Sequence, residues 1–410
     1  MTNYLSNYFF EWSELLVLWL HIIAGIAWIG ASFYFVWLDD HLEPVSGPEP
    51  GDPGVAGELW AVHGGGFYRS RKYRVAPEKL PPTLHWFYWE AYTTWISGFA
   101  MLCLLYFRDA DIYLIDPAVM ALSRLAAIGI AVGVIAANWI VYDGMCRSVL
   151  GRKPKLLAVA IALMTVLDAW GLCHVFSGRG AFMVFGASLG TIMVANVLFV
   201  IIPGQRELVR AKQEGREVDP VPGLKGKQRS RHNTYFTLPV LFAMISNHFA
   251  MTYGARENWL VLLAMSFAGA CIRGWFVARH KPEGRRGLKA ALPAAFAAVT
   301  LVCLIAALAP TERALGARPS AAAPVLAGSA IMTIVKQRCA PCHSDRPAAK
   351  FGFASPPHGI VFANLHDLRM RRAEVREMLS SDTMPPGNVT GLTNKERAEI
   401  LRWIAQRARK

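Results

Sequence analysis

Residues 12 to 38 read "WSELLVLWLHIIAGIAWIGASFYFVWL", an apolar run that contains one charged side chain, Glu14. An α-helix needs about 20 predominantly apolar residues to cross the hydrocarbon core of a bilayer, so this run is long enough to span a membrane. No basic residue precedes it, and it is far longer than the apolar core of a secretion signal. We therefore expect it to be retained as a membrane helix rather than removed as a leader.

Similar runs recur along the first three quarters of the chain. The sequence is 54% hydrophobic and only 18% charged, which is too apolar for a soluble globular protein. Taking each run of about 20 or more mostly apolar residues as one helix, we predict an all-α fold that begins with an eight-span transmembrane bundle, residues 1 to 310. The predicted spans are 12 to 38, 83 to 107, 119 to 142, 155 to 177, 181 to 203, 234 to 253, 257 to 279 and 289 to 310.

Basic residues are distributed unevenly among the connections between these spans. Lys and Arg gather in the first, third, fifth and seventh connections, whereas the second, fourth and sixth hold one each, namely Arg108, Arg179 and Arg256. Because cationic connections stay on the cytoplasmic side, we expect both termini to face outward. The net charge of +14 is spread between apolar runs instead of lying on one face of a soluble domain. The lipid bilayer is therefore a predicted partner, and nucleic acid is not.

The segment "RCAPCHSD" near the C-terminus contains a Cys-x-x-Cys-His pattern. In this pattern the two cysteines attach haem c covalently and the histidine ligates its iron, which assigns these roles to Cys339, Cys342 and His343. A structural zinc site is the alternative, but zinc would need four Cys or His ligands, and His358 and His366 lack paired spacing. The other cysteines are dispersed along the spans, so we expect them to be packing residues.

A second iron ligand is expected further along the chain. The segment "TMPPGN" offers Met384, whose thioether lies on a stretch that two prolines hold extended. His358 and His366 are the alternative ligands. Methionine ligation raises the reduction potential relative to ligation by two histidines, which suits an acceptor of electrons from an organic substrate.

The rest of the C-terminal region fits a small haem domain. Thr393 with Glu396 forms a capping-box pattern ahead of an apolar stripe, which predicts a final helix. The preceding stretch, 311 to 327, is rich in Ala and Pro and is predicted to be a linker. Residues 328 to 410 therefore resemble a class I cytochrome c, in which covalently held haem supplies much of the apolar interior.

Histidines within the predicted spans are candidates for a functional site, because ionisable groups are costly inside a membrane. His21, His174 and His248 are expected at a similar depth, roughly 5 to 12 Å below the outer surface. Each alone is typical of a hydrogen-bonded packing residue, whereas the three together would suit a metal, a haem b or a substrate. We therefore name all three as candidate catalytic residues.

A second group of candidates lies near the inner surface. The segments "GELWAVHGGGFYRSRKY" and "LHWFYWEAYTTWISGF" contain three consecutive glycines, many aromatic residues and Glu90. Close approach of backbone to a ligand and a flexible loop entering an aromatic belt are both compatible with this pattern. Glu90 is a fourth candidate catalytic residue. Asp168 and Arg273, both within spans, would form an ion pair with a structural role.

Several of these segments together resemble a known family. The run "HIIAGIAWIGASFYFVWLDDHLEP", the "VHGGGFY" segment, the "HWFYWEAYTTWISG" segment and the Cys-x-x-Cys-His tail are similar to the membrane-bound, cytochrome c-linked urate oxidases of bacteria, also called urate hydroxylases. The resemblance implies that urate is the substrate and 5-hydroxyisourate the product. It also implies that electrons pass to the respiratory chain without formation of peroxide.

This reaction removes two electrons, whereas one haem c accepts a single electron at a time. A haem b held by two of His21, His174 and His248 would store the second electron, and a urate radical is the alternative. A histidine or Glu90 would accept the proton from urate. The expected acceptor of electrons is a soluble cytochrome c or a terminal oxidase, and the expected location is the bacterial inner membrane with the N-terminus and the cytochrome domain in the periplasm.

A different class of function is also compatible with the sequence. The spans would then handle haem or copper, and the cytochrome would relay electrons for a partner dehydrogenase. A purely anchoring role for the helices is disfavoured, because one span would be enough to tether a cytochrome.

Overall fold

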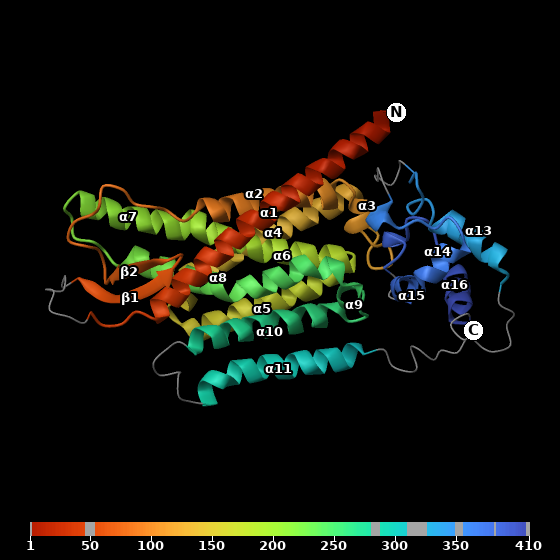
Figure 1. Cartoon of the computed structure of the whole chain (residues 1–410). Helices are drawn as coiled ribbons and strands as arrows, with labels where there is room; N and C mark the ends of the chain where they lie inside the picture. The colour runs from red at the N-terminus through yellow and green to blue at the C-terminus, as the bar shows by residue number, and fades with distance from the viewer. Residues whose placement is uncertain are drawn as a thin grey trace.

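The computed structural model describes residues 2–45, 54–279, 288–309, 326–348, 356–380 and 383–406. The chain is mostly helical, as predicted. Figure 1 shows a long bundle of helices with a smaller group of helices packed at one end. The predicted linker, 311 to 327, lies outside the described residues except for its last two positions.

The bundle contains eleven α-helices in its described residues. They are α1 (Thr2–Asp40), α2 (Trp89–Met101), α3 (Ala110–Tyr113), α4 (Arg124–Arg147), α5 (Pro154–Cys173), α6 (Gly178–Asn196), α7 (Ile202–Gln213), α8 (Val221–Ile245), α9 (Ala250–Tyr253), α10 (Asn258–Ala278) and α11 (Leu288–Leu308). Two segments of π-helix, η1 (Leu102–Phe107) and η3 (Val197–Ile201), continue α2 and α6 respectively.

Six helices of the described chain are long and apolar enough to cross a membrane. They are α1, α4, α5, the continuous α6–η3–α7 helix, α10 and α11. The other two predicted spans correspond to α2 with η1 and to the second half of α8 with the short helices after it. α8 is a single helix that begins at Val221, well before the predicted span at 234, and its first half is rich in Lys and Arg.

Packing around α6 explains the centre of the bundle. α6 contacts α8, α4 and α5, and its small residues permit close approach, since a Cβ at Gly186 would lie 2.8 Å from the Cβ of Ala243 in α8. The apolar residues of α1 and α11 are largely exposed. Exposed apolar helices of this kind are expected where the surrounding medium is lipid.

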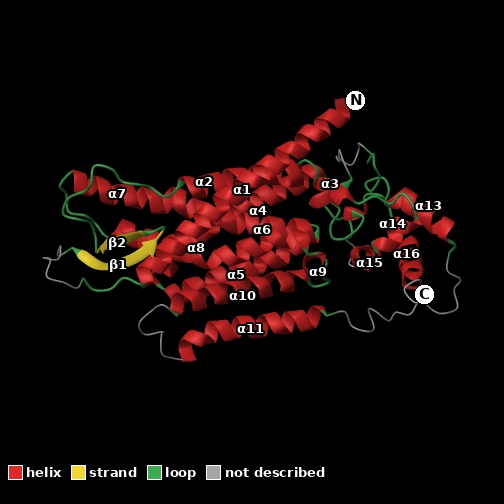
Figure 2. Ribbon diagram, in the orientation of Figure 1, coloured by secondary structure: helices red, strands yellow, loops and turns green. Residues whose placement is uncertain are grey.

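A two-stranded hairpin interrupts the helical fold between α1 and α2. β1 (Val55–His63) pairs with β2 (Gly66–Tyr73) in an antiparallel register. Gly64 and Gly65 form the turn with φ of 57° and 81°, which is the left-handed backbone that a tight hairpin turn needs. The first two of the three consecutive glycines therefore serve the turn, and the segment is an ordered hairpin rather than a flexible loop. Figure 2 shows the hairpin at the end of the bundle opposite the C-terminal domain.

The C-terminal domain has a hydrophobic core of its own. Its helices are α13 (Gly328–Arg338), α14 (Leu365–Met370), α15 (Arg372–Ser380) and α16 (Asn394–Gln406). Ile331 and Val335 of α13 are buried in one cluster with Ile400 and Trp403 of α16. The first and last helices of the domain therefore pack against each other.

Candidate functional site

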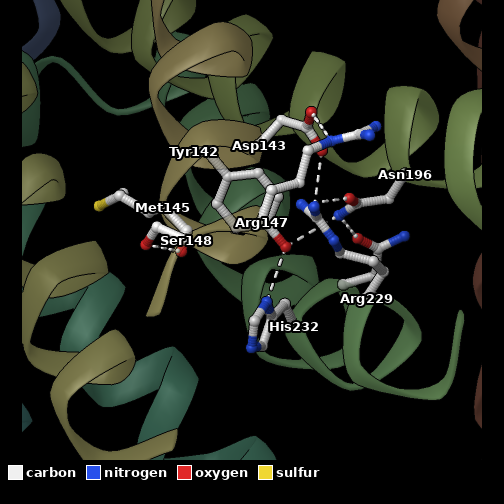
Figure 3. Close-up of polar contacts among 9 residues, drawn as sticks. Tyr142, Asp143, Met145, Arg147, Ser148, Asn196, Arg229 and His232 are labelled. Atoms are coloured by element: carbon white, nitrogen blue, oxygen red, sulfur yellow. Dashed lines mark hydrogen bonds and ion pairs between the residues drawn. The ribbon is translucent and has the colours of Figure 1, made fainter. Parts of the chain in front are cut away.

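A buried polar network lies in the half of the bundle near the hairpin. Tyr142 Oη of α4 is 2.7 Å from Nδ1 of His232 in α8, and it accepts a hydrogen bond of 3.1 Å from Nδ2 of Asn196 in α6. The same Asn196 amide donates to Oδ1 of Asn233 at 2.9 Å. Figure 3 shows the side chains of three helices converging on this point. The network ties α4, α6 and α8 together.

Arg229 brings a buried charge into this network. Its Nη2 donates to Oδ1 of Asp143 at 2.6 Å and its Nη1 to Oδ1 of Asn196 at 3.3 Å. Asp143 also accepts from Nε of Arg147 at 2.5 Å. Only 4% of the Arg229 side chain is exposed, and a buried charge is tolerated only when it is paired. The carboxylate of Asp143 therefore neutralises Arg229 within the protein.

A cavity of about 600 Å³ lies beside this network. Its walls include the buried Arg229 and the exposed cations Arg152 and Lys225. Phe199 of the π-helical segment also lines it, and such segments are frequent at functional sites. The cavity is positively charged and opens at the basic end of the bundle, which suits anions approaching from that side.

The opposite end of the bundle carries the C-terminal domain. The turn η7 (Pro386–Asn388) packs against α3, and α15 packs against α9. Met378 of α15 contacts the hydrophobic core of the bundle. Figure 1 shows α3 and α9 facing the C-terminal helices. The turn that follows Met384 therefore lies directly on the bundle.

The Cys-x-x-Cys-His segment forms a tight turn at the end of α13. The backbone N–H groups of Cys342 and His343 both donate to the carbonyl of Cys339, at 3.2 and 2.9 Å. Nδ1 of His343 donates to the carbonyl of Ile360 at 3.1 Å, which fixes the ring through the nitrogen that a proximal haem histidine does not use for iron. Burial raises the pKa of the Cys339 thiol to about 12, so the thiol is protonated before any attachment. These residues fit a covalently held haem c.

Met384 is held in place by its backbone. Its carbonyl accepts a hydrogen bond of 3.1 Å from Nη1 of Arg397, and its N–H donates to the carbonyl of Met378 at 3.3 Å. His366, one of the alternative ligands, is exposed on α14. The side chain of His358, the other alternative, lies outside the described residues.

The three histidines of the predicted membrane site have different surroundings. His21 lies between two helices, where its Nδ1 donates to the carbonyl of Thr94 at 2.9 Å and lies 3.2 Å from Oγ of Ser97. His174 and His248 are exposed at the end of the bundle that carries the C-terminal domain. His174 donates to the carbonyl of Trp170 at 2.6 Å. The structure therefore gives His21 a packing contact and places the other two at the surface.

Glu90 lies at the other end of the bundle, in the first turn of α2. Asp168 accepts from Nδ2 of Asn138 at 2.9 Å, while the guanidinium of Arg273 lies 3.6 Å from the ring centroid of Phe33. The predicted ion pair between Asp168 and Arg273 is therefore wrong. Among the described residues, no group of three or more His, Cys, Asp or Glu side chains is placed to hold a metal ion.

The polar network was not predicted from the sequence. Its signal was present, because Tyr142 and Asn196 are polar residues inside apolar runs and His232 with Asn233 adjoins the sixth run. Hydropathy assigned these residues to spans or to span ends. It did not show that their side chains point toward one another.

Comparison with known families gives one match. The model of a family described as Urate oxidase N-terminal matches residues 7–309. The comparisons with curated proteins and with solved structures found no match. The matched range covers the helical bundle from residue 7 onward and stops before the C-terminal domain. The chain therefore belongs to the urate oxidase N-terminal family.

Proposed function

We propose that this chain is a membrane-bound urate oxidase whose C-terminal domain is a class I cytochrome c. Urate would be hydroxylated by water to 5-hydroxyisourate, and its electrons would pass through haem c to the respiratory chain instead of forming peroxide. Membership of the family supports urate as the substrate. One observation carries the rest of the proposal: Cys339, Cys342 and His343 lie in a domain that packs against the end of the bundle matched by the family.

Haem c, when bound, supplies a one-electron acceptor whose potential methionine ligation raises. The residues of this chain position it. Cys339 and Cys342 would attach it, and the carbonyl of Ile360 orients the ring of His343. Arg397 and the carbonyl of Met378 fix the backbone of Met384, which would be the second ligand.

The proposed topology follows from the arrangement of charge. We propose eight crossings of the bacterial inner membrane, with the N-terminus and the cytochrome domain in the periplasm. The hairpin and α7 belong to the basic first and fifth connections, and both lie at the end of the bundle away from the C-terminal domain. Basic connections stay on the cytoplasmic side, which supports this orientation. A soluble cytochrome c or a terminal oxidase would reoxidise the domain there.

Loss of electrons from urate is accompanied by loss of protons, so the site needs a proton acceptor. His174 and His248 lie at the end of the bundle on which the C-terminal domain packs, and we propose that one of them serves this role. The roles of His21 and Glu90, and a haem b between two of the histidines, stay predictions.

The test uses the purified holoprotein in detergent without oxygen. Adding urate should reduce the haem c absorption bands with no partner protein present, and each urate consumed should deliver two electrons to an added soluble acceptor. The matched control is the double variant Cys339→Ser, Cys342→Ser, which should bind no covalent haem and reduce no acceptor. A pyridine haemochrome spectrum counts haem c and haem b in the same sample.

Two results would contradict the proposal. A colourless wild-type protein would remove the cytochrome. Haem bands that stay oxidised in excess urate, but are reduced when a partner dehydrogenase is added, would favour the relay function.

A further inference from the structure

The contact between the C-terminal domain and the bundle covers a group of aromatic residues around one arginine. The guanidinium carbon of Arg179 lies 5.6 Å from the ring centroid of Tyr113 and 5.5 Å from that of Tyr253, and Nη2 donates to the Tyr253 hydroxyl at 3.2 Å. The Tyr106 ring is 5.8 Å from the Tyr113 ring, and its hydroxyl donates to Oδ1 of Asn247 at 2.9 Å. We call these five residues the Arg179 cluster.

The Arg179 cluster joins helices that meet at the docked domain. Tyr113 ends α3, against which the turn η7 packs, and Tyr253 ends α9, against which α15 packs. Burial raises the pKa of Tyr113 to about 12, so its phenol stays neutral at physiological pH. The turn η7, which begins two residues after Met384, therefore packs against the helix that ends at Tyr113.

Arg179 lacks the counter-charge that a partly buried cation needs. Within the described part of the chain, no carboxylate lies within 4.0 Å of its guanidinium, and its contacts are neutral phenols. Two other arginines are paired: Arg108, at the same end of the bundle, has Asp109 at 3.8 Å, and Arg229 has Asp143 at 2.6 Å. An anion bound at Arg179 would balance the charge of Arg179, as Asp143 balances the charge of Arg229.

The shape of the cluster favours a flat anion. Tyr113 and Arg179 are only partly buried, so a phenol ring offers a face for stacking and a planar guanidinium offers N–H donors for oxygen atoms in one plane. Arg179 is also the second residue of the 19-residue helix α6, whose N-terminus adds positive potential. Urate is a planar purine that carries one negative charge at neutral pH. We propose that the Arg179 cluster binds urate and that Tyr113 lies between the bound anion and the cytochrome domain.

This inference rests on the proposed function and names its substrate site. The oxygen of one water molecule forms a bond to C5 of urate, and the C4–C5 double bond is replaced by a carbon–nitrogen double bond at C4. Two protons leave to a base and to solvent. Two electrons would leave one at a time, and the haem c of the proposed function would supply the one-electron oxidant.

The position of the cluster distinguishes it from two other cationic sites. The cavity at Arg229 lies at the far end of the bundle, and its buried charge is already paired. Arg273 also has no carboxylate within 4.0 Å in the described chain. It lies fifteen residues after Asn258, where α10 starts close to α9, so it is about 22 Å along the helix from the end that carries the C-terminal domain. Electron transfer slows steeply with distance, so a site beside the cytochrome domain is favoured.

The test measures binding of radiolabelled urate to the holoprotein by equilibrium dialysis. The holoprotein is first reduced with dithionite, because the reduced protein cannot accept electrons and therefore does not consume urate. Arg179→Gln should weaken binding about tenfold or more, because a charged hydrogen-bond donor is lost, and Arg179→Lys should retain part of the affinity. Arg273→Gln is the matched control and should bind within about twofold of wild type. Haem content and elution volume in size-exclusion chromatography verify folding of each variant.

A second measurement separates binding from electron transfer. Tyr113→Phe should slow reduction of haem c by urate in stopped-flow experiments at saturating urate, where a change in urate affinity no longer limits the rate. Unchanged binding in Arg179→Gln, or an equal loss in Arg273→Gln, would overturn the inference. A different result is that the reduced wild type binds urate through Arg179 while urate fails to reduce the oxidised haem. In that case the proposed oxidase function is wrong and the inferred binding site is retained.

Discussion

Asp143 is the residue on which the buried charges of the polar network depend. It accepts hydrogen bonds from Arg229 at 2.6 Å and from Arg147 at 2.5 Å. Asp143→Asn would leave the guanidinium of Arg229 buried without a counter-charge, which typically costs about 3–5 kcal/mol. We expect a large fall in the midpoint of thermal unfolding in detergent.

Glu207→Gln is the control for Asp143→Asn. Glu207 forms ion pairs with Arg210 and Arg216, but its partners are about half or more exposed, and exposed pairs contribute roughly 0–1 kcal/mol. Similar unfolding midpoints for the two variants would show that Arg229 does not depend on Asp143.

His21 makes a packing contact that a single methyl group should disturb. A Cβ added at Gly98 would lie 2.8 Å from Cε1 of the His21 ring, whereas a Cβ at Gly129 would meet no atom within 4 Å. Gly98→Ala should therefore force α1 and α2 apart and destabilise the protein by about 1–3 kcal/mol. Gly129→Ala should be neutral or stabilising, because alanine favours the helix.

The comparison is made by thermal unfolding of both variants in detergent. Equal unfolding midpoints would mean that the His21 ring can move aside at no cost. In that case His21 would be free to serve another role, such as the ligand role that the sequence suggested.

These residues also show what the sequence could predict. The positions of His174 and His248 near the outer end follow from counting residues along apolar runs, and the structure places both at the end that carries the C-terminal domain. Which way each side chain points depends on rotation about the helix axis, which hydropathy does not report. The packing of His21 against α2 and the convergence of Tyr142 with His232 therefore required the structure.

At the scale of single elements, α16 is stabilised by the capping box that the sequence predicted. The N–H of Thr393 donates to Oε2 of Glu396 at 2.8 Å, and the N–H of Glu396 donates to Oγ1 of Thr393 at 3.2 Å. Nη2 of Arg338 in α13 donates to Oε1 of Glu396 at 3.1 Å. These bonds, chiefly the one from the Thr393 backbone, lower the pKa of Glu396 below its ordinary value of 4.5.

A lowered pKa means that the folded domain favours the ionised carboxylate. Its stabilising contribution is therefore present above about pH 4.5 and is lost as the pH falls through the lowered pKa. We expect the amides of α16 to exchange hydrogen faster, relative to the intrinsic rate, as the solution is made acidic. Glu396→Gln should exchange faster at pH 7 and should lack this acid dependence.

Hydrogen exchange followed by mass spectrometry of peptides from α16 measures both effects in the intact protein. Glu374→Gln is the control, because Glu374 pairs with Arg371 on the exposed side of the domain, and it should leave α16 unchanged. An acid dependence that persists in Glu396→Gln would assign it to another group.

Helices formed by one apolar run were predicted well, whereas the hairpin and the start of α8 were not. The apolar runs of α4, α5 and α10 end within a few residues of the predicted spans. The hairpin was missed because exposed aromatic residues hide the alternation of a strand, although Gly64 and Gly65 form a recognisable turn. The start of α8 was missed because basic residues that favour a helix lie outside an apolar run.

At the scale of the whole molecule, the bundle and the C-terminal helices have separate hydrophobic cores. The sequence shows a change in composition between them, from apolar runs to a charged, cysteine-containing segment. Their contact through α3 and α9 was not predictable. It joins short elements that are distant in sequence, and such docking depends on surface shape.

The orientation of the molecule in the membrane gives the last prediction. Gln213, exposed at the end of α7, and Ala118, exposed in the connection between α3 and α4, lie at opposite ends of the bundle. Because basic connections stay in the cytoplasm, the end with α7 should face inward and the end with the C-terminal domain outward. A membrane-impermeant maleimide should therefore label Ala118→Cys in intact spheroplasts and Gln213→Cys only after permeabilisation, with the wild type as the background for native thiols. Covalent haem attachment takes place on the outer side of bacterial membranes, so the reverse labelling pattern would place Cys339 and Cys342 where haem c cannot be attached.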